Sequence, residues 1–198
     1  GPTLEHIARE KAGIFKPGIR AVSVPQEPAA AAALREVAER VGAPLSFVEV
    51  DGELVVGLAG RHQQENATLA LALLRHAGVP LREPDVARGL MQVKWPARYE
   101  RVCADPPVIL DGAHNETAGR ALVEVALADA ALRSRPIFLV LGMTGGHDPS
   151  GFATTLAPLR PRAVTAVACR SPRTHNAAAV ARACARCDGA RRRCCCWP

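Results

Sequence analysis

Aromatic residues and lysine are scarce in this sequence, and long apolar runs are missing. Only 4% of the 198 residues are aromatic, and the lysines are Lys11, Lys16 and Lys94. Without stacking aromatics, a surface that binds nucleic acid is disfavoured. No apolar run reaches the ~18 residues of a membrane span, and no secretory signal is visible. We expect a soluble cytoplasmic protein, or an organellar one if a transit peptide precedes Gly1, with neither nucleic acid nor membrane as a partner.

Two phosphate-binding motifs are also missing. The 198 residues contain no G-x-x-x-x-G-K-[ST] loop and no G-x-G-x-x-G. The glycine cluster of residues 142–146 lacks the Lys and Ser/Thr that phosphate and Mg²⁺ binding would need. A nucleotide enzyme built from this chain alone would therefore lack a phosphate cradle.

The cysteines argue against a disulfide framework, because no secretory context accompanies them and their number is odd. The count is seven, which is odd, and five of these residues lie in the last fifteen or so positions. Cys184-x-x-Cys187 followed by Cys194 suggests a zinc site, yet three adjacent cysteines at 194–196 are poorly spaced for one tetrahedron and no His follows. We favour an unstructured tail over zinc.

The net charge of +6 belongs to the C-terminal end. Residues 170–198 hold seven basic residues and one acidic residue, whereas residues 1–169 are balanced. One hypothesis is therefore a Rossmann-like binding module whose basic tail engages an acidic partner, including RNA. The balanced remainder argues for a different function in the rest of the chain.

Hydrophobic periodicity predicts an α/β protein in which helices alternate with short strands. Trp95-Pro96 interrupts the pattern, which predicts domains at 1–94 and 95–187 and a disordered tail at 188–198. Strand 108–110 should be buried and should join the two later strands in a small doubly wound domain. The predicted helices are 3–12, 28–41, 63–77, 84–91, 117–132, 151–159 and 176–185, and the predicted strands are 19–24, 45–50, 108–110, 136–141 and 163–168.

The densest polar cluster follows a strand, at Asp111-Gly112-Ala113-His114-Asn115. Ligands of open α/β sheets bind outside the carboxyl ends of strands. The Asp111 carboxylate suits a ribose hydroxyl, the small Gly112 lets backbone approach a ligand, and His114 can donate to a phosphate or share a proton. The alternative is a turn in which Asp111 caps the next helix.

Three further side chains are candidates for ligand contacts. Arg98 can clamp phosphate bidentately, although an ordinary exposed arginine is the alternative. The amide of Asn66 can both donate and accept, as adenine recognition requires, but it could also cap its helix. Lys11 lies on the apolar side of a helix, where a lysine either extends its charge to solvent or serves as a modified amine.

Five ordered blocks resemble the folylpolyglutamate synthase family, together with the related dihydrofolate synthases and, more distantly, the Mur ligases. The blocks are T-L-E-H-I-A-R-E-K-A-G-I-F-K-P-G (3–18), G-R-H-Q-Q-E-N-A (60–67), W-P-A-R-Y-E (95–100), L-D-G-A-H-N (110–115) and S-P-R (171–173). The resemblance implies the end of a P-loop-type Mur ligase central domain, which binds ATP, followed by a Rossmann-like C-terminal ligase domain. It also implies an amide ligase that uses ATP and Mg²⁺ to join L-glutamate to a folate or dihydropteroate through an acyl phosphate.

The same resemblance implies a role for each candidate residue. Lys11 would be carbamylated and would help hold Mg²⁺, since a carbamate is an oxygen ligand suited to a hard cation. Arg98 would contact the ATP phosphates, Asp111 the nucleoside, and Asn66 the adenine. His114 would lie near the reacting carboxyl and phosphate groups, so Lys11 and His114 are the catalytic candidates.

The chain also departs from the family pattern. Ala97 replaces the usual Gly, Glu116 replaces the usual Pro, and the family's phosphate-binding loop would lie upstream of Gly1. We therefore expect the C-terminal portion of a monomeric ligase, inactive by itself, that takes only small-molecule substrates. A peptidoglycan ligase of the Mur type is a third hypothesis, against which the folate-type block at 3–13 argues.

Overall fold

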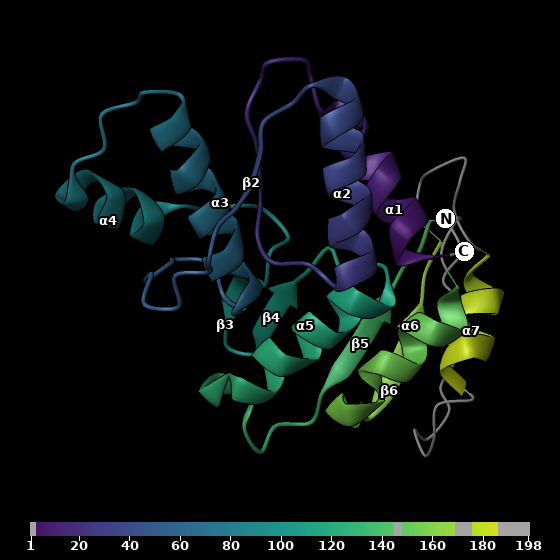
Figure 1. Cartoon of the computed structure of the whole chain (residues 1–198). Helices are drawn as coiled ribbons and strands as arrows, with labels where there is room; N and C mark the ends of the chain where they lie inside the picture. The colour runs from purple at the N-terminus through teal and green to yellow at the C-terminus, as the bar shows by residue number, and fades with distance from the viewer. Residues whose placement is uncertain (1–2, 145–147, 169–175, 186–198) are drawn as a thin grey trace. The chain divides into compact units, whose positions relative to one another are not determined.

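The chain forms helices that alternate with short strands (Figure 1). The computed structural model describes residues 3–144, 148–168 and 176–185, and the chain divides into two compact units, Gly1–Lys94 and Trp95–Pro198. The mixture of elements confirms the α/β expectation. Within the described ranges, no helix is long and apolar enough to cross a bilayer. The 171–173 block and the 188–198 tail lie outside the described residues.

The first unit is built around a parallel strand pair with a helical crossover. Strands β1 and β2 pair with Ala21 opposite Leu45, and α2 connects them. Its elements are α1 (Leu4–Lys11), a 3-10 turn η1 (Ala12–Ile14), β1 (Ala21–Ser23), α2 (Pro28–Val41), β2 (Leu45–Phe47), α3 (His62–His76) and α4 (Glu83–Gln92).

Local signals fix the helix ends in this unit. Thr3 caps α1, since its hydroxyl accepts the His6 amide at 3.2 Å. Helix α2 starts with Pro28 and ends at Gly42, which has φ of 75° and so adopts the left-handed conformation that glycine tolerates best. Small buried alanines, among them Ala8 and Ala33, form the core where α1 and α2 pack.

The second unit contains an antiparallel hairpin and a parallel strand pair with helices. The elements are β3 (Glu100–Ala104), β4 (Pro107–Leu110), α5 (Glu116–Ala128), η2 (Ala130–Leu132), β5 (Phe138–Leu141), α6 (Pro149–Leu156), η3 (Ala157–Leu159), β6 (Ala163–Ala166) and α7 (Ala177–Ala185). Strands β5 and β6 run parallel with Phe138 opposite Ala163. The core of this unit gathers Val123, Met143, Phe152, Leu156 and Val180.

Two expectations about the strands are wrong. The strand at 108–110 is not buried, because Val108 and Leu110 are 43% and 47% exposed. It pairs with β3, which the sequence did not predict, in an antiparallel ladder rather than with β5. A hairpin with one solvated face alternates inward and outward residues, so only every second side chain packs inside.

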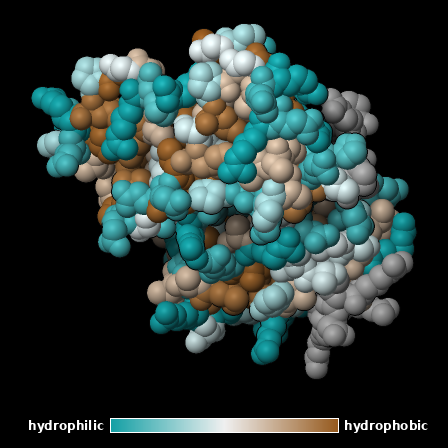
Figure 2. All heavy atoms as spheres, viewed as in Figure 1, coloured by the Kyte–Doolittle hydropathy of each residue, from teal (hydrophilic) through white to brown (hydrophobic). Residues whose placement is uncertain are grey.

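Strand β5 also has one solvated face. Leu139 and Leu141 pack against the core, whereas Phe138 and Val140 are 62% and 69% exposed. Exposed apolar side chains occur in the first unit as well, and Figure 2 shows them among hydrophilic residues over the α3–α4 region, where Leu73, Leu74 and Met91 are exposed.

Candidate functional site

The β3–β4 hairpin brings together the segments that carry Arg98, just before β3, and Asp111, just after β4. Glu100 pairs with Leu110 at the base of the hairpin. Just beyond this pair, the Tyr99 amide donates to Asp111 Oδ2 at 2.9 Å, and the Gly112 amide donates to the Ala97 carbonyl at 2.9 Å. The segment around Arg98 is thereby held against the strand end that carries the polar cluster.

The Asp111 carboxylate organises this strand end. Its Oδ1 accepts the Ala113 amide at 2.8 Å, while Oδ2 accepts Tyr99. Each oxygen has two lone pairs, so the carboxylate keeps acceptor capacity for a ligand hydroxyl. The alternative that Asp111 caps the next helix is wrong, because Asn115 caps α5 by accepting the Ala118 amide at 2.9 Å.

Arg98 lies directly against a glycine. A Cβ on Gly112 would come within 2.9 Å of Arg98 Nη1 and 3.4 Å of the Ala97 carbonyl oxygen, so a side chain at this position would make the guanidinium shift. Arg98 is exposed, and Nη1 makes one long contact, 3.4 Å, to the Ala97 carbonyl. In the part of the chain that the structure describes, its guanidinium forms no ion pair, which leaves its donors for an anion.

His114 follows in the same loop. Its Nδ1 lies 2.9 Å from the Gly112 carbonyl oxygen. Because a carbonyl oxygen can only accept, this contact requires a proton on Nδ1, which donates it. Arg98, Asp111, Gly112 and His114 thus combine a cation, a carboxylate, a close backbone approach and an imidazole in one exposed loop cluster.

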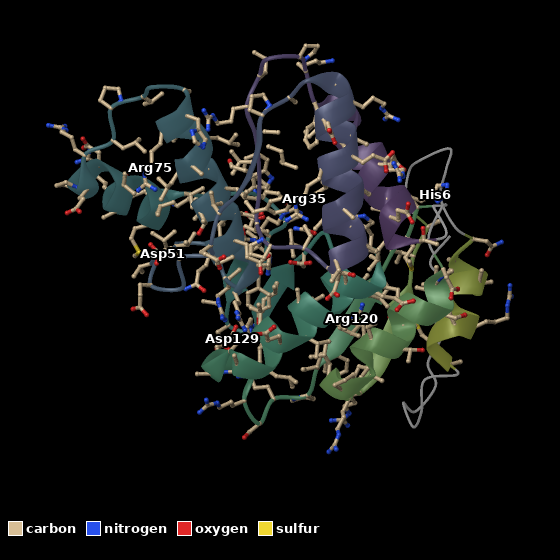
Figure 3. All side chains as sticks on the ribbon, in the orientation of Figure 1. His6, Arg35, Asp51, Arg75, Arg120 and Asp129 are labelled. Carbon is tan, nitrogen blue, oxygen red and sulfur yellow. The ribbon has the colours of Figure 1, made fainter. Side chains whose placement is uncertain are left out.

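A second cluster supports this loop, and sequence reasoning missed it. The Tyr99 hydroxyl donates to Asp129 Oδ2 at 3.0 Å, and Arg101 Nη2 donates to the same oxygen at 2.6 Å. Asp129 Oδ1 accepts the Ala131 amide at 2.9 Å and so begins η2. Asp129, labelled in Figure 3, lies at the end of α5, and its side chain is only 13% exposed.

The pKa values of the two groups move apart. Burial by itself would raise the pKa of Asp129, but the hydrogen bonds from the Ala131 amide and the Tyr99 hydroxyl, with the charge of Arg101, hold that pKa below its usual value. Burial, followed by the bond to Asp129, raises the pKa of the Tyr99 phenol well above its usual value. Tyr99 therefore remains a neutral donor and Asp129 an ionised acceptor.

Lys11 lies at the end of α1, in the first unit. Its side chain is 74% exposed, and Nζ lies 3.5 Å from Glu10 Oε1. The neighbouring apolar positions Leu4 and Ile7 are 58% and 41% exposed, so Lys11 does not extend from a buried helix face. Among the described residues, no group of three or more His, Cys, Asp or Glu side chains could hold a metal ion.

Asn66 lies in the first turns of α3 but does not cap the helix. Its Nδ2 donates at 3.1 Å to Oε1 of Gln63, a polar residue that is only 5% exposed. The side-chain nitrogen of Gln63, Nε2, in turn lies 2.8 Å from His62 Nε2. Gln63 therefore orients Asn66. Sequence reasoning did not single out Gln63, although it lies in the same block, G-R-H-Q-Q-E-N-A.

A cavity lies in another part of the first unit. It encloses about 530 Å³ among residues of the 48–55 loop, α3 and α4. Leu71, Val86 and Leu90 line it together with Asp51 and Arg75, both of which are labelled in Figure 3. None of the predicted site residues lines this cavity.

A match to a protein-family model covers most of the second unit. Residues 97–195 match the family model described as "Mur ligase, glutamate ligase domain". The chain is 31% identical over 174 residues to the dihydrofolate synthase/folylpolyglutamate synthase of Bacillus subtilis. This alignment covers 69% of this chain and 40% of that protein. It is 30% identical over 198 residues to the human mitochondrial folylpolyglutamate synthase, covering 80% of this chain and 34% of that protein.

Solved structures agree with the sequence relatives. The folylpolyglutamate synthase of Mycobacterium tuberculosis complexed with ADP superimposes with a TM-score of 0.83 and 27% identity, over 94% of this chain and 47% of that one. A bifunctional folylpolyglutamate synthase/dihydrofolate synthase with Mn, AMPPNP and L-glutamate bound gives a TM-score of 0.78 and 30% identity, over 92% and 47%. The chain thus spans less than half the length of these relatives.

Proposed function

The chain belongs to the Mur ligase family through its glutamate ligase domain, and on this basis we propose that it forms part of an ATP-dependent ligase that adds L-glutamate to a folate or dihydropteroate. In this assignment, residues 1–94 are the end of the ATP-binding central domain and residues 95–187 are the C-terminal ligase domain. Relatives named as folate synthases support a folate substrate over a peptidoglycan precursor.

The observation that carries the proposal is the pairing of Arg98 with the Asp111–Gly112 strand end. ATP presents phosphate oxygens and ribose hydroxyls, which require donors and acceptors respectively. The exposed Arg98 guanidinium offers several N–H donors to phosphate, and the Asp111 carboxylate keeps lone pairs for a hydroxyl. The missing side chain of Gly112 allows a nucleotide to approach both groups.

The proposed reaction has two steps, formation of an acyl phosphate and formation of the amide. A carboxylate oxygen of the folate attacks the γ-phosphorus of ATP, which forms an acyl phosphate and releases ADP. The amine of L-glutamate then attacks the acyl carbon, which forms the amide and releases phosphate and a proton. Arg98 would stabilise charge on the phosphoryl oxygens, and His114 would lie near the reacting carboxyl and phosphate groups, where an imidazole can share a proton.

The first unit would contribute Lys11 and Asn66. Mg²⁺ would neutralise phosphate charge when bound, and a carbamylated Lys11 would supply one oxygen ligand, consistent with the preference of Mg²⁺ for carboxylate-like oxygens. The described residues include no group of three or more His, Cys, Asp or Glu that could hold a metal ion, so the other ligands of the Mg²⁺ would come from elsewhere. Asn66, oriented by Gln63, would contact adenine.

We also propose that the protein is a monomer whose partners are small molecules and not nucleic acid, and that it acts in the cytoplasm or in an organelle. The alternative of a binding module with an RNA-binding tail depends on residues 170–198. Most of these lie outside the described residues, and no observation in the structure favours that alternative.

A chimera tests the function. In it, this chain replaces the matching part of the Bacillus subtilis relative, and the assay measures ATP-dependent addition of glutamate to a folate. We expect activity in the chimera and none in the 198 residues alone, which contain no phosphate-binding loop motif. Arg98→Ala should lower kcat roughly 100-fold, whereas Arg133→Ala, at another exposed arginine, should not.

Two results would contradict the proposal. Unchanged kinetics in the Arg98→Ala chimera would remove Arg98 from the site. Glutamate addition to a peptidoglycan precursor but not to a folate would assign the chain to the other branch of the family. Lys11 is tested separately, by intact-mass measurement of the CO₂ adduct in bicarbonate buffer, with Lys16→Arg as the control variant and Lys11→Arg as the variant that should lose the adduct.

A further inference from the structure

The backbone on both sides of Arg98 adopts an unusual conformation. Ala97 and Tyr99 have φ of 54° and 48°, in the left-handed region that residues with a Cβ rarely occupy. Such conformations persist only where surrounding contacts hold them in place. The contacts that hold Ala97 and Tyr99 therefore decide where Arg98 lies.

Three hydrogen bonds hold the turn from its backbone. The Ala97 carbonyl accepts the Gly112 amide at 2.9 Å, and the Ala97 amide donates to Glu100 Oε2 at 2.9 Å. The Tyr99 amide donates to Asp111 at 2.9 Å. All three bonds involve backbone groups of Ala97 or Tyr99, and none involves the Tyr99 side chain.

Asp129 supplies the hydrogen bond to the Tyr99 side chain. The Tyr99 ring packs against the core of the unit, and its hydroxyl reaches Asp129 Oδ2, which also accepts Arg101. Arg101 belongs to β3, so Asp129 connects the start of the hairpin to the end of α5. Its side chain is 13% exposed and that of Arg101 is 35% exposed, which limits competition from water.

We propose that Asp129 is a positioning residue: through Tyr99 and Arg101 it holds the left-handed turn that keeps Arg98 beside Gly112. Loss of the Tyr99–Asp129 bond lets Tyr99 relax toward negative φ, and the peptide that follows Arg98 then rotates. Arg98 Nη1 thereby moves away from Gly112, where it now lies 2.9 Å from the position that a Cβ would take. The value of this placement for nucleotide binding rests on the proposed function, whereas the placement itself does not.

The test is a double-mutant cycle in the chimera described above, with ADP as the probe, because the 198 residues alone contain no phosphate-binding loop motif. ADP affinity is measured by titration for the unsubstituted chimera, Arg98→Ala, Asp129→Ala and the double variant. Because Asp129 acts through Arg98, Asp129→Ala should weaken ADP binding about tenfold in the native background and have almost no effect in the Arg98→Ala background. Equal effects in both backgrounds would overturn the proposal.

Two milder variants separate positioning from folding. Tyr99→Phe removes only the phenol hydrogen bond and leaves the Ala131 cap, so it should reproduce most of the loss. Asp129→Asn keeps an acceptor for Tyr99 and should restore most of the affinity. The matched control is Asp105→Ala, which removes another carboxylate paired with an arginine of this unit, Arg135 at 3.2 Å, and should leave ADP affinity unchanged.

A second readout does not depend on nucleotide. The NMR order parameter of the Arg98 Nε–Hε group reports how firmly the side chain is held. It should fall in Asp129→Ala and Tyr99→Phe while backbone amides of β5 and β6 keep their native chemical shifts. An unchanged Arg98 order parameter in both variants overturns the positioning role. If the unsubstituted chimera binds no ADP while the order parameter still falls in the variants, the result contradicts the proposed function alone.

Discussion

The two units hold their candidate residues in different ways. In Trp95–Pro198, Arg98, Asp111 and His114 are connected through backbone hydrogen bonds across a hairpin base. In Gly1–Lys94, among the described residues, Lys11 forms an ion pair with its neighbour Glu10, and Asn66 donates a hydrogen bond to Gln63 three positions away. The second unit thus carries a preformed cluster, whereas the first carries single groups whose chemistry needs ligands that its described residues do not supply.

The units also differ in their ion pairs. Arg9 joins α1 to α2 by pairing with Glu36 at 2.6 Å and with Glu5 at 2.9 Å, and the side chains of these glutamates are 55% and 52% exposed. The bond from Arg9 lowers the pKa of Glu36. Asp129, in contrast, is largely shielded from water. Since exposed pairs are screened by salt and shielded ones much less so, ionic strength should distinguish the two units.

The largest expected effect tests whether the second unit depends on its own core. Phe152 is 3% exposed, so Phe152→Ala should lower the free energy of unfolding by about 3–5 kcal/mol. The only tyrosine and both tryptophans belong to residues 95–198, so fluorescence follows this unit during urea denaturation. Phe138→Ala, at a phenylalanine 62% exposed, is the control and should cost far less.

A glycine substitution compares the site with a helix of the first unit. Gly112→Ala places a Cβ 2.9 Å from Arg98 Nη1, so it should displace the guanidinium and weaken ADP binding about tenfold. Gly89→Ala in α4 meets nothing within 4 Å and should instead stabilise the protein by about 0.5–1 kcal/mol. Native ADP affinity in Gly112→Ala would show that the close approach is not needed.

Acid and salt titrations should distinguish the two ion-pair clusters. Both Asp129 and Glu36 have lowered pKa values in the folded chain. The stability that each carboxylate contributes is therefore present above its unfolded pKa of about 4 and is lost as pH falls through the folded value.

The variants Asp129→Asn and Glu36→Gln remove these contributions separately. Asp129→Asn should cost about 1 kcal/mol at pH 7, measured by fluorescence, and should flatten the acid loss of stability in the second unit. Glu36→Gln should have a smaller effect that disappears in high salt. Equal salt sensitivity of the two variants would remove the distinction between shielded and exposed pairs.

The smallest effect concerns Ala97. Its φ of 54° is easy for glycine and unfavourable for alanine. Ala97→Gly should relieve this strain but increase the entropy of the unfolded chain, so the net change in unfolding free energy should stay within about 1 kcal/mol. Arg98 should become slightly more mobile, which NMR relaxation can detect. A large loss of stability would mean that Ala97 makes contacts other than its backbone hydrogen bonds.

Sequence signals predicted the fold best where the determinants are local. Helix α2 was predicted at its observed bounds, because Pro28 and Gly42 mark its ends directly. Strand β3 was missed because four of its five residues are exposed and its sequence, E-R-V-C-A, carries no clear apolar alternation. Without β3 no hairpin was predicted, and no spacing in the sequence indicated that Arg98 lies beside Gly112.

Asp129 was missed for a related reason. The apolar pattern favoured one helix over 117–132, whereas α5 ends at Ala128 and a separate turn begins with Asp129 as its cap. An Asp before a short apolar run was the available signal. Its bonds to Tyr99 and Arg101 span about thirty residues of sequence, and no periodicity or spacing rule could predict them. The roles of Lys11, Asn66, Arg98, Asp111 and His114 remain predictions.

The ladder between β3 and β4 has a consequence for insertions and deletions. Because Glu100 pairs with Leu110 at the hairpin base, residues added near the far turn, around Asp105, lengthen both strands without moving Arg98 or Gly112. One residue added between Tyr99 and Glu100 would instead separate the Ala97–Gly112 bond from the ladder that aligns it. Natural length variation in this segment should therefore concentrate at the turn, and the distance in sequence from Arg98 to Asp111 should vary in proteins that keep the same site.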